Sequence, residues 1–265
     1  MCCLKKPTID ADYLRGQIRD NSVRIIDVRR SEDYKKDHIP KSVNLPLAEL
    51  LADDSPENVL KITQKLGIDD QTPVAVYDDT FGALASRVAW TLQYLGHSDV
   101  SLLEMTYSQW KGLGLEVDSS ENIPSQKTHS VKLRPEIMAT ADYLEKAKEN
   151  KNVIVIDNRE RLNYLEQHIP GAINIPYLTL SSENKILKPK EELKRLLKNR
   201  NIPENAEIIT YCGSVGTLSG LAYYALQSAD YQNVKLYVRS FKEWKGLNKP
   251  IIKQENANYW DLSAE

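Results

Sequence analysis

The sequence predicts an α/β protein of two tandem domains with the same fold, each a mostly parallel sheet flanked by helices on both faces. Two observations support this prediction. The chain repeats itself over nearly its full length, and in each repeat short apolar runs alternate with segments patterned as helices. Strands that alternate with helices are typical of parallel sheets covered on both sides.

The internal repeat is recognised by its constant spacing. IIDVRRSEDYKKDHIPKSVNLP (25–46) recurs as VIDNRERLNYLEQHIPGAINIP (155–176), so Asp27, Arg29 and His38 recur 130 positions later. Further on, VAVYDDTFGALASRVAWTLQYLG (74–96) aligns with IITYCGSVGTLSGLAYYALQSAD (208–230) at a spacing of 134. A four-residue loop insertion in the second half explains the change of spacing.

The repeats place one domain at 1–118 and the other at 132–265. The stretch between them, 119–131, is polar and aperiodic, and it predicts a linker.

Each half is expected to begin with a helix capped by Asp10 or Thr140. Strands are predicted at 24–28, 74–77 and 101–104 in the first half, and at 153–157, 208–211 and 234–238 in the second. Ser55 is a candidate cap for a further helix with Pro56 at its first position. Ligands of such sheets bind beyond the carboxyl ends of the strands.

Composition excludes several classes of function. The formal net charge is −2, which gives no electrostatic reason to expect nucleic acid or a membrane as a direct partner. The three cysteines match neither a disulfide framework nor a zinc site, so we expect no bound metal and a reducing, cytoplasmic setting. Cys2 and Cys3 are expected to be terminal bystanders, with lipid attachment as the weaker alternative.

Cys212 stands directly after a predicted strand, in the stretch IITYCGSVGTLSG (208–220). A loop of small residues before a helix allows consecutive backbone N–H groups to point inward and to stabilise a thiolate. Gly213 and Gly216 permit the backbone conformations that such a loop needs, and the helix near Thr217 adds its dipole. We therefore predict that Cys212 is a nucleophile, with an inert packed cysteine as the alternative. Phosphatase chemistry is disfavoured, because Thr217 and Leu218 follow where an arginine would clamp a phosphoryl group.

Two motifs give the chain a family resemblance: Asp-x-Arg followed by His-Ile-Pro-Gly-Ala-x-Asn (157–174), and Tyr-Cys-Gly-Ser-x-x-Thr (211–217). With them, the sequence resembles the tandem-domain rhodanese family of thiosulfate and 3-mercaptopyruvate sulfurtransferases. The resemblance implies transfer of a sulfane sulfur from a small donor, through a Cys212 persulfide, to a thiol, cyanide or protein acceptor. No organic cofactor is expected. The alternative is a sulfur-relay or partner-binding module with little turnover of small molecules.

The resemblance also implies roles for further residues. The loop residues Gly213, Ser214, Val215, Gly216 and Thr217 would hold the sulfur, and Arg159 would brace the site. The hydroxyls of Ser214 and Thr217 suit either the thiolate or a helix cap. Cys-Gly-Ser is similar to the mercaptopyruvate branch, in which a His and an Asp assist the Ser. His38 and Asp27 match them, although both have a twin in the other half, which favours a structural role.

The sequence departs from the family pattern in three places. Val215-Gly216 stands in the reverse of the usual order. Asn163 replaces a substrate-binding arginine, with Arg161 two residues earlier, and Arg239 lies where a glycine is usual. Arg161 and Arg239 are therefore tentative donor-binding residues.

The first half has Asp78 at the position of Cys212, so it is expected to be catalytically degenerate. We expect Asp78 to be a solvated loop carboxylate, with a separate catalytic acid as the alternative.

Overall fold

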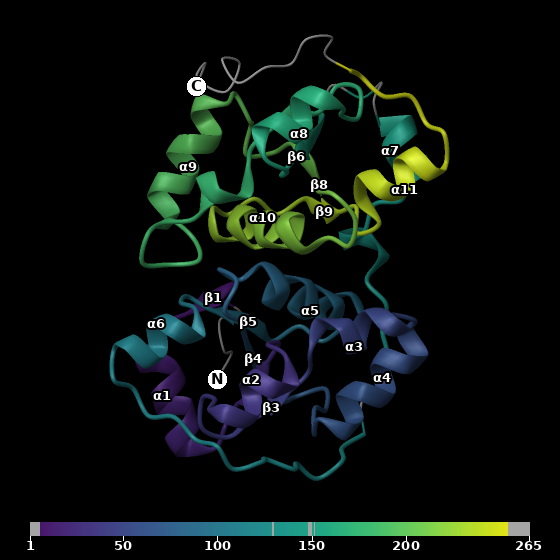
Figure 1. Ribbon diagram of the computed structural model, residues 1–265. Helices are drawn as coiled ribbons and strands as arrows, with labels where there is room; N and C mark the ends of the chain where they lie inside the picture. Colours follow the sequence, from purple (N-terminus) through teal and green to yellow (C-terminus); the bar gives the residue numbers. More distant parts are fainter. Residues whose placement is uncertain (1–5, 129, 148–149, 151, 254–265) are drawn as a thin grey trace. The chain divides into compact units, whose positions relative to one another are not determined.

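The computed structural model describes residues 6–128, 130–147, 150 and 152–253, and it divides into two compact α/β units (Figure 1). Unit 1 comprises residues 1–134 with Glu183–Ile186, and unit 2 comprises the rest of the chain. Every pairing between the named strands is parallel, which confirms the predicted fold class. In the described part of the chain, no helix has the length and apolar character needed to cross a bilayer.

The sheet of unit 1 has the order β1-β5-β4-β2-β3. Its strands are β1 (Thr8–Ile9), β2 (Arg24–Asp27), β3 (Ser42–Asn44), β4 (Val74–Tyr77) and β5 (Val100–Leu103). Its helices are α1 (Ala11–Asp20), α2 (Ser31–Lys36), α3 (Leu47–Ala52), α4 (Pro56–Lys65), α5 (Ala83–Tyr94) and α6 (Tyr107–Gly112).

Helices cover both faces of this sheet because alternate strand residues point to opposite sides. On one face, Leu14 of α1 and Trp110 of α6 pack with Ile25 and Ala75. On the other face, α5 packs against β4 and β5, with α3 beside it. The carboxyl ends of β2 and β4 are thereby held at one edge, where the loop after β4 begins.

Unit 2 repeats this plan with the order β7-β6-β8-β9. Its strands are β6 (Val153–Asp157), β7 (Ile173–Asn174), β8 (Glu207–Tyr211) and β9 (Val234–Leu236). Its α-helices are α7 (Ala141–Ala147), α8 (Arg161–Glu166), α9 (Lys190–Asn199), α10 (Thr217–Ser228) and α11 (Ser240–Gly246), with 3₁₀ turns η1 (Pro135–Ile137) and η2 (Tyr177–Leu180). In place of a fifth strand, Met138 forms a single parallel bridge with Leu236.

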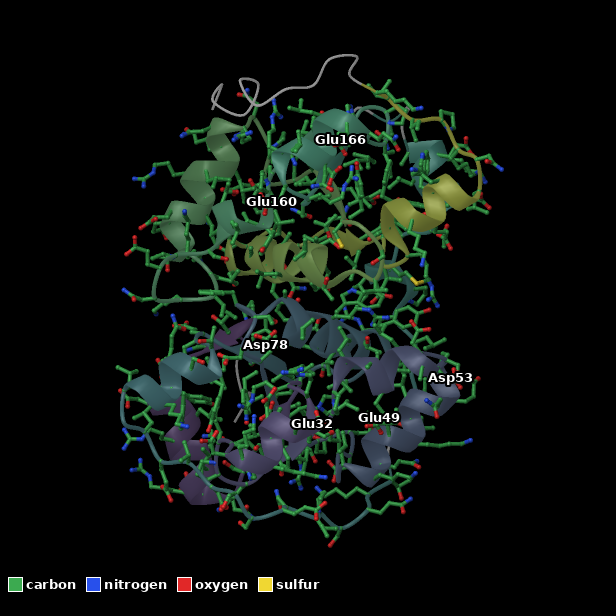
Figure 2. All side chains as sticks on the ribbon, viewed as in Figure 1. Glu32, Glu49, Asp53, Asp78, Glu160 and Glu166 are labelled. Atoms are coloured by element: carbon green, nitrogen blue, oxygen red, sulfur yellow. The ribbon has the colours of Figure 1, made fainter. Side chains whose placement is uncertain are left out.

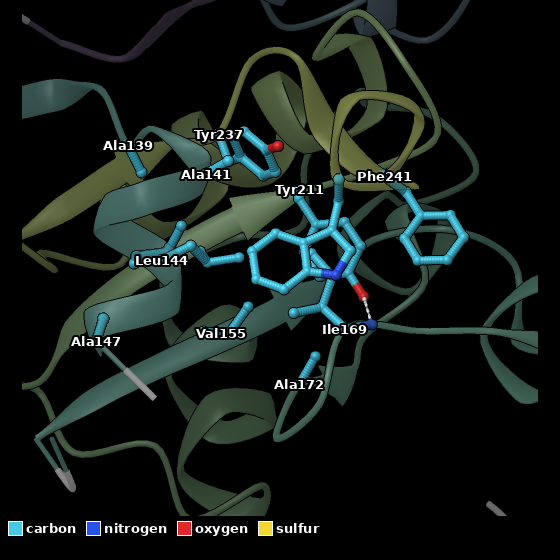
Figure 3. Close-up of a cluster of buried hydrophobic side chains, with 12 residues drawn as sticks. Ala139, Ala141, Leu144, Ala147, Val155, Ile169, Ala172, Tyr211, Tyr237 and Phe241 are labelled. Carbon is cyan, nitrogen blue, oxygen red and sulfur yellow. Dashed lines mark hydrogen bonds between the residues drawn. The ribbon is translucent and has the colours of Figure 1, made fainter. Parts of the chain in front are cut away.

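The core beneath the second sheet positions the strand that leads to the cysteine. Leu144 of α7, Tyr211 of β8 and Trp244 of α11 pack with Val155 and Ile169 (Figure 3). Tyr211 also accepts a hydrogen bond from the Ile169 N–H through its hydroxyl, at 3.2 Å. The end of β8 is therefore anchored by both apolar and polar contacts. The opposite face is covered by α10.

The predicted helix starts are confirmed. Asp10 caps α1 by accepting from the Tyr13 N–H at 2.7 Å, and Thr140 accepts from the Tyr143 N–H at 3.2 Å. Ser55 caps α4, which begins at Pro56.

Two segments lie in unit 1 through contacts that the sequence did not indicate. The described residues of the predicted linker, 119–128, 130 and 131, form no helix or strand, and Lys127 N–H donates to the Gln64 carbonyl at 3.1 Å. The four-residue insertion falls between η2 and α9, since α3 and η2 start 130 positions apart whereas α4 and α9 start 134 apart. Within that loop, Ile186 N–H donates to the Glu104 carbonyl of unit 1 at 2.9 Å, and Lys185 pairs with the Glu104 carboxylate.

Candidate active site

Cys212 lies directly after β8, at the carboxyl edge of the second sheet. It is a free cysteine and only 2% exposed. Two main-chain hydrogen bonds tie its loop to α11: Phe241 N–H donates to the Cys212 carbonyl at 3.1 Å, and Lys242 N–H donates to the Gly213 carbonyl at 2.9 Å. The start of the loop is therefore fixed from both the strand side and the helix side.

Gly216 makes the turn from this loop into α10. Its φ of +75° lies in the left-handed region, whereas Gly213 is not among the residues with positive φ. A Cβ added at Gly216 would lie 3.1 Å from Cγ2 of Val238. Only glycine meets both conditions without strain. The reversed order Val215-Gly216 thus places the glycine at the position that needs it.

Ser240 is a neighbour of the thiol that sequence analysis did not single out. Its Oγ lies 3.7 Å from Cys212 Sγ, within the range of a weak O–H···S bond, and it accepts from the Cys212 N–H at 3.1 Å. It also lies 3.0 Å from the Tyr237 carbonyl, so the single hydroxyl proton has two acceptors to choose from. Ser240 is fully buried and has a φ of +55°. This strained backbone at a non-glycine residue was not readable from the sequence.

The matching loop in unit 1 holds a carboxylate. Asp78 is 2% exposed, so the expectation of a solvated side chain was wrong. Its oxygens accept from four backbone N–H groups at 2.8–2.9 Å, those of Thr80, Gly82, Leu84 and Ala85. The Thr80 hydroxyl donates as well, at 2.9 Å. The loop is an anion cradle, and its own aspartate fills it.

The second loop makes the same glycine turn into its helix without that carboxylate, although Phe81 of the first loop has a φ of +53° and its counterpart Val215 is not among the residues with positive φ. Gly82 and Gly216 both precede their helices with left-handed backbone, at φ 80° and 75°. The N–H groups that correspond to the four donors belong to Ser214, Gly216, Leu218 and Ser219. Among the residues that the structure describes, these four have no protein acceptor. By correspondence with unit 1, these four N–H groups are available to an anion at the loop that begins with Cys212.

Arg159 is held in place near the cysteine loop by hydrogen bonds and an aromatic contact. It binds Asp157 through Nε and Nη2, donates to the Gln167 carbonyl at 2.6 Å, and lies 4.2 Å from the Phe241 ring centroid. Burial, together with the Asp157 charge, holds the pKa of Tyr211 well above its usual value, so this phenol remains neutral. The guanidinium of Arg159 thus bonds within unit 2 and lies against Phe241, whose N–H donates to the Cys212 carbonyl.

His38 and Asp27 lie in unit 1, where both make internal contacts. The His38 ring stacks on the Tyr34 ring, with 3.9 Å between the ring centroids. Its Nδ1 lies 2.8 Å from the Tyr34 carbonyl oxygen and its Nε2 lies 3.2 Å from the Ser120 carbonyl oxygen. Asp27 binds Arg29 and accepts from the Tyr77 hydroxyl at 2.6 Å. His168 and Asp157 repeat the stacking and the arginine pair in unit 2.

The remaining candidates lie near the ends of helices. Ser214 is exposed and Thr217 is the first residue of α10. Arg161 starts α8 with its guanidinium 5.5 Å from the Tyr164 ring centroid, and Arg239 is exposed at the start of α11. Cys2 and Cys3 lie outside the described residues.

Comparison with known proteins agrees with this geometry. The family profile described as "Rhodanese-like domain" matches residues 10–113 and 140–247, which covers most of the chain. The 3-mercaptopyruvate sulfurtransferase of Escherichia coli K12 is 27% identical over 89% of this chain and 94% of its own length. The sulfur carrier protein TtuD of Thermus thermophilus is 27% identical over 93% and 96%. The crystal structure of Escherichia coli SseA, described as a 3-mercaptopyruvate sulfotransferase, gives a TM-score of 0.80 at 25% identity, over 89% of this chain and 99% of that one.

Proposed function

The chain belongs to the rhodanese family, and from this premise we propose that it is a sulfurtransferase whose sulfur carrier is Cys212. The Cys212 thiolate attacks the sulfane sulfur of a donor, and an Sγ–S bond forms while the donor bond to that sulfur breaks. With thiosulfate, sulfite leaves with the bonding electron pair. With 3-mercaptopyruvate, the pyruvate enolate leaves and takes up a proton. A thiolate or cyanide then attacks the outer sulfur of the persulfide, which returns the Cys212 thiolate.

The observation that carries this proposal is the pair of matched loops. A cysteine persulfide has the connectivity Cβ–Sγ–S, which parallels the Cβ–Cγ–O of aspartate. In unit 1, the N–H cradle holds the carboxylate oxygens of Asp78 at 2.8–2.9 Å. The equivalent N–H groups of unit 2 are therefore placed to hold the outer, negatively charged sulfur of a Cys212 persulfide.

The supporting residues follow from their contacts. We place Gly216 and Arg159 in the scaffold of the loop, and we place His38 and Asp27 in the scaffold of unit 1, because their polar atoms are already bonded within it. Arg161 and Arg239 stay proposed donor contacts. A buried free thiol suits a reducing compartment, and the cytoplasm is the compartment that we propose.

Relatives point to more than one use of the same chemistry. The rat relative is named a thiosulfate sulfurtransferase and the Escherichia coli relative a 3-mercaptopyruvate sulfurtransferase, whereas the Thermus relative is named a sulfur carrier protein. The Cys212 loop itself contains no Lys or Arg. A relay that delivers sulfur to a protein acceptor is therefore the second candidate, and it uses the same persulfide.

Intact-protein mass spectrometry tests the persulfide. The protein is incubated with thiosulfate or 3-mercaptopyruvate and then with dithiothreitol, in parallel with Cys212→Ser. We expect a gain of one sulfur atom that dithiothreitol removes and that the variant lacks. No gain with either donor, from a thiol that alkylates normally, would contradict the proposal.

Thiocyanate release distinguishes the two candidates. An enzyme with small donors forms thiocyanate from cyanide over many turnovers. A relay forms the persulfide but turns over slowly until its protein acceptor is present.

A further inference from the structure

Unit 1 has a cavity of about 500 Å³ at the mouth of its Asp78 loop. The charged side chains that line this cavity have ion-pair or hydrogen-bond partners within unit 1. Lys111 pairs with Asp37, and Ser108 donates to the Asp79 carboxylate at 2.6 Å. Asp33 pairs with Lys36 and Arg30, at 3.1 and 3.2 Å. The cavity beside the filled cradle is therefore electrostatically satisfied without a ligand.

At the matching positions of unit 2, the lysine is retained but its carboxylate partner is replaced. Lys111 recurs as Lys245, whereas Asp37, which binds it, recurs as the neutral Gln167. Ser108 becomes a second lysine, Lys242, and its partner Asp79 becomes Gly213. In the described part of the chain, neither Lys242 nor Lys245 has an ion-pair partner. The described part of unit 2 thus has two ammonium groups without an ion-pair partner. Their counterparts in unit 1, Ser108 and Lys111, line the cavity at the Asp78 loop.

Contacts within unit 2 attach both lysines to the cysteine loop. Lys242 N–H donates to the Gly213 carbonyl at 2.9 Å, so its Cα is fixed beside the residue after the cysteine. Lys245 Nζ lies 5.9 Å from the ring centroid of Phe241, the residue whose N–H holds the Cys212 carbonyl. Both side chains are exposed and long enough to reach a ligand at the loop.

The other side of this site carries the opposite charge. Arg30 and Lys36 of unit 1 recur as Glu160 and Glu166, which lie at the two ends of α8 (Figure 2). These carboxylates repel an anion, whereas the α11 lysines attract it. With Arg161 as the one cation from Glu160 to Glu166, this segment carries a net charge of −1, so an anionic donor is favoured on the side of α11.

We propose that Lys242 and Lys245 of α11 bind the anionic end of the sulfur donor and so replace the cationic residues that the Cys212 loop lacks. This inference rests on the proposed function for the identity of the ligand. The charge effect itself is measurable without any sulfur transfer.

The test compares alkylation of Cys212 by anionic iodoacetate and neutral iodoacetamide, followed by peptide mass spectrometry at low ionic strength. In Lys242→Ala/Lys245→Ala we expect the iodoacetate rate to fall about three- to tenfold, because two exposed charges are removed. The iodoacetamide rate should be unchanged. Lys190→Ala/Lys194→Ala on α9 removes the same charge from lysines paired with Asp230, and it should leave both rates unchanged.

A second variant asks whether loss of the partner matters. Gln167→Asp gives Lys245 a carboxylate at the position where Asp37 pairs with Lys111 in unit 1. We expect this variant also to lower the iodoacetate rate. Equal rate ratios in wild type, the α11 double variant and Gln167→Asp would overturn the inference. A thiol inert to both reagents would also overturn it, since no open route would lead from these lysines to the sulfur.

Turnover then separates this inference from the proposed function. The α11 variant should raise KM for thiosulfate with little change in kcat. Altered alkylation without any persulfide in the wild type would leave the charge effect standing and remove the sulfurtransferase. A normal persulfide with unaltered alkylation would do the reverse.

Discussion

The loop after β4 and the loop after β8 have nearly the same backbone and opposite chemistry. Each follows a buried Tyr and turns through a left-handed glycine. The carbonyl of Asp78 accepts from the Tyr107 N–H of α6 at 2.9 Å, and the carbonyl of Cys212 accepts from the Phe241 N–H of α11 at 3.1 Å. The decisive difference is the first side chain of each loop, Asp78 in unit 1 and Cys212 in unit 2. In unit 1 the anion is the carboxylate of Asp78, whereas in unit 2 we propose that the loop receives an anion formed on Cys212.

The residues around the two loops also differ: polar groups that bond to one another in unit 1 are replaced or reoriented in unit 2. Thr106 of unit 1 uses its hydroxyl to cap α6 in a capping box with Gln109. Its counterpart Ser240 adopts left-handed backbone and places its hydroxyl at the Cys212 thiol instead. The carboxylates Asp37 and Asp79 are replaced by Gln167 and Gly213. Unit 1 thus satisfies its polar groups internally, and unit 2 keeps them available at the cysteine loop.

The largest expected effect comes from giving the second loop the residue of the first. Cys212→Asp should abolish sulfur transfer, because a carboxylate cannot accept a sulfane sulfur. Its folding stability should nevertheless equal or exceed that of Cys212→Ser, since its oxygens can accept from the four N–H groups of the loop. Thiocyanate release and urea unfolding measure the two quantities. A Cys212→Asp variant less stable than Cys212→Ser would show that the two cradles differ.

Removing the anion from the first loop is the converse experiment. Asp78→Ala leaves the N–H groups of Gly82 and Ala85, both buried residues, without an acceptor. We expect unit 1 to lose about 2–4 kcal/mol of its free energy of unfolding. Asp78→Asn, which retains one acceptor oxygen, should lose less. Equal stability of wild type and Asp78→Ala in urea unfolding would contradict the structural role of this carboxylate.

The sequence predicted most of the fold and the central residue of the site, for physical reasons. Strands, helix caps and the glycine turn depend on local sequence. Because the repeat has a constant spacing, each feature recognised in one half also predicted its counterpart in the other half. Burial of Asp78 could not be predicted, because a loop aspartate is usually solvated and its four donors depend on the turn geometry. The position of Ser240 beside Cys212 depends on a φ of +55° that no local pattern favours. The contact of Ile186 with Glu104 joins distant segments, which a single sequence does not reveal.

A smaller effect is expected when the cysteine is moved to the first loop. Asp78→Cys in a Cys212→Ser background places a thiol in the cradle of unit 1. We expect it to gain one reducible sulfur atom in mass spectrometry, about tenfold more slowly than wild type, because Lys36 and Lys111 of the adjacent cavity are already paired with Asp33 and Asp37 and attract an anionic donor less strongly. Adding Asp37→Asn and Asp79→Gly should recover part of the rate. No sulfur uptake by either variant would mean that the cradle alone is insufficient.

The smallest effect tests the ion pair that unit 2 has lost. Hydrogen bonds from Lys111 and Tyr107 hold the pKa of Asp37 below its ordinary value of 3.8. A depressed carboxyl pKa stabilises the fold above the unfolded-state pKa, and this stability is lost as the pH falls through the lower, folded-state pKa. Asp37→Asn should therefore destabilise unit 1 at neutral pH, by about 1 kcal/mol or less because Lys111 is largely exposed. The difference from wild type should shrink as the pH falls below about 4, and it should vanish only once the pH is below the folded-state pKa of Asp37. Gln167→Asn changes the uncharged counterpart without altering any charge, so its effect in urea unfolding should not depend on pH. A pH-independent effect of Asp37→Asn would show that the pair contributes packing rather than charge.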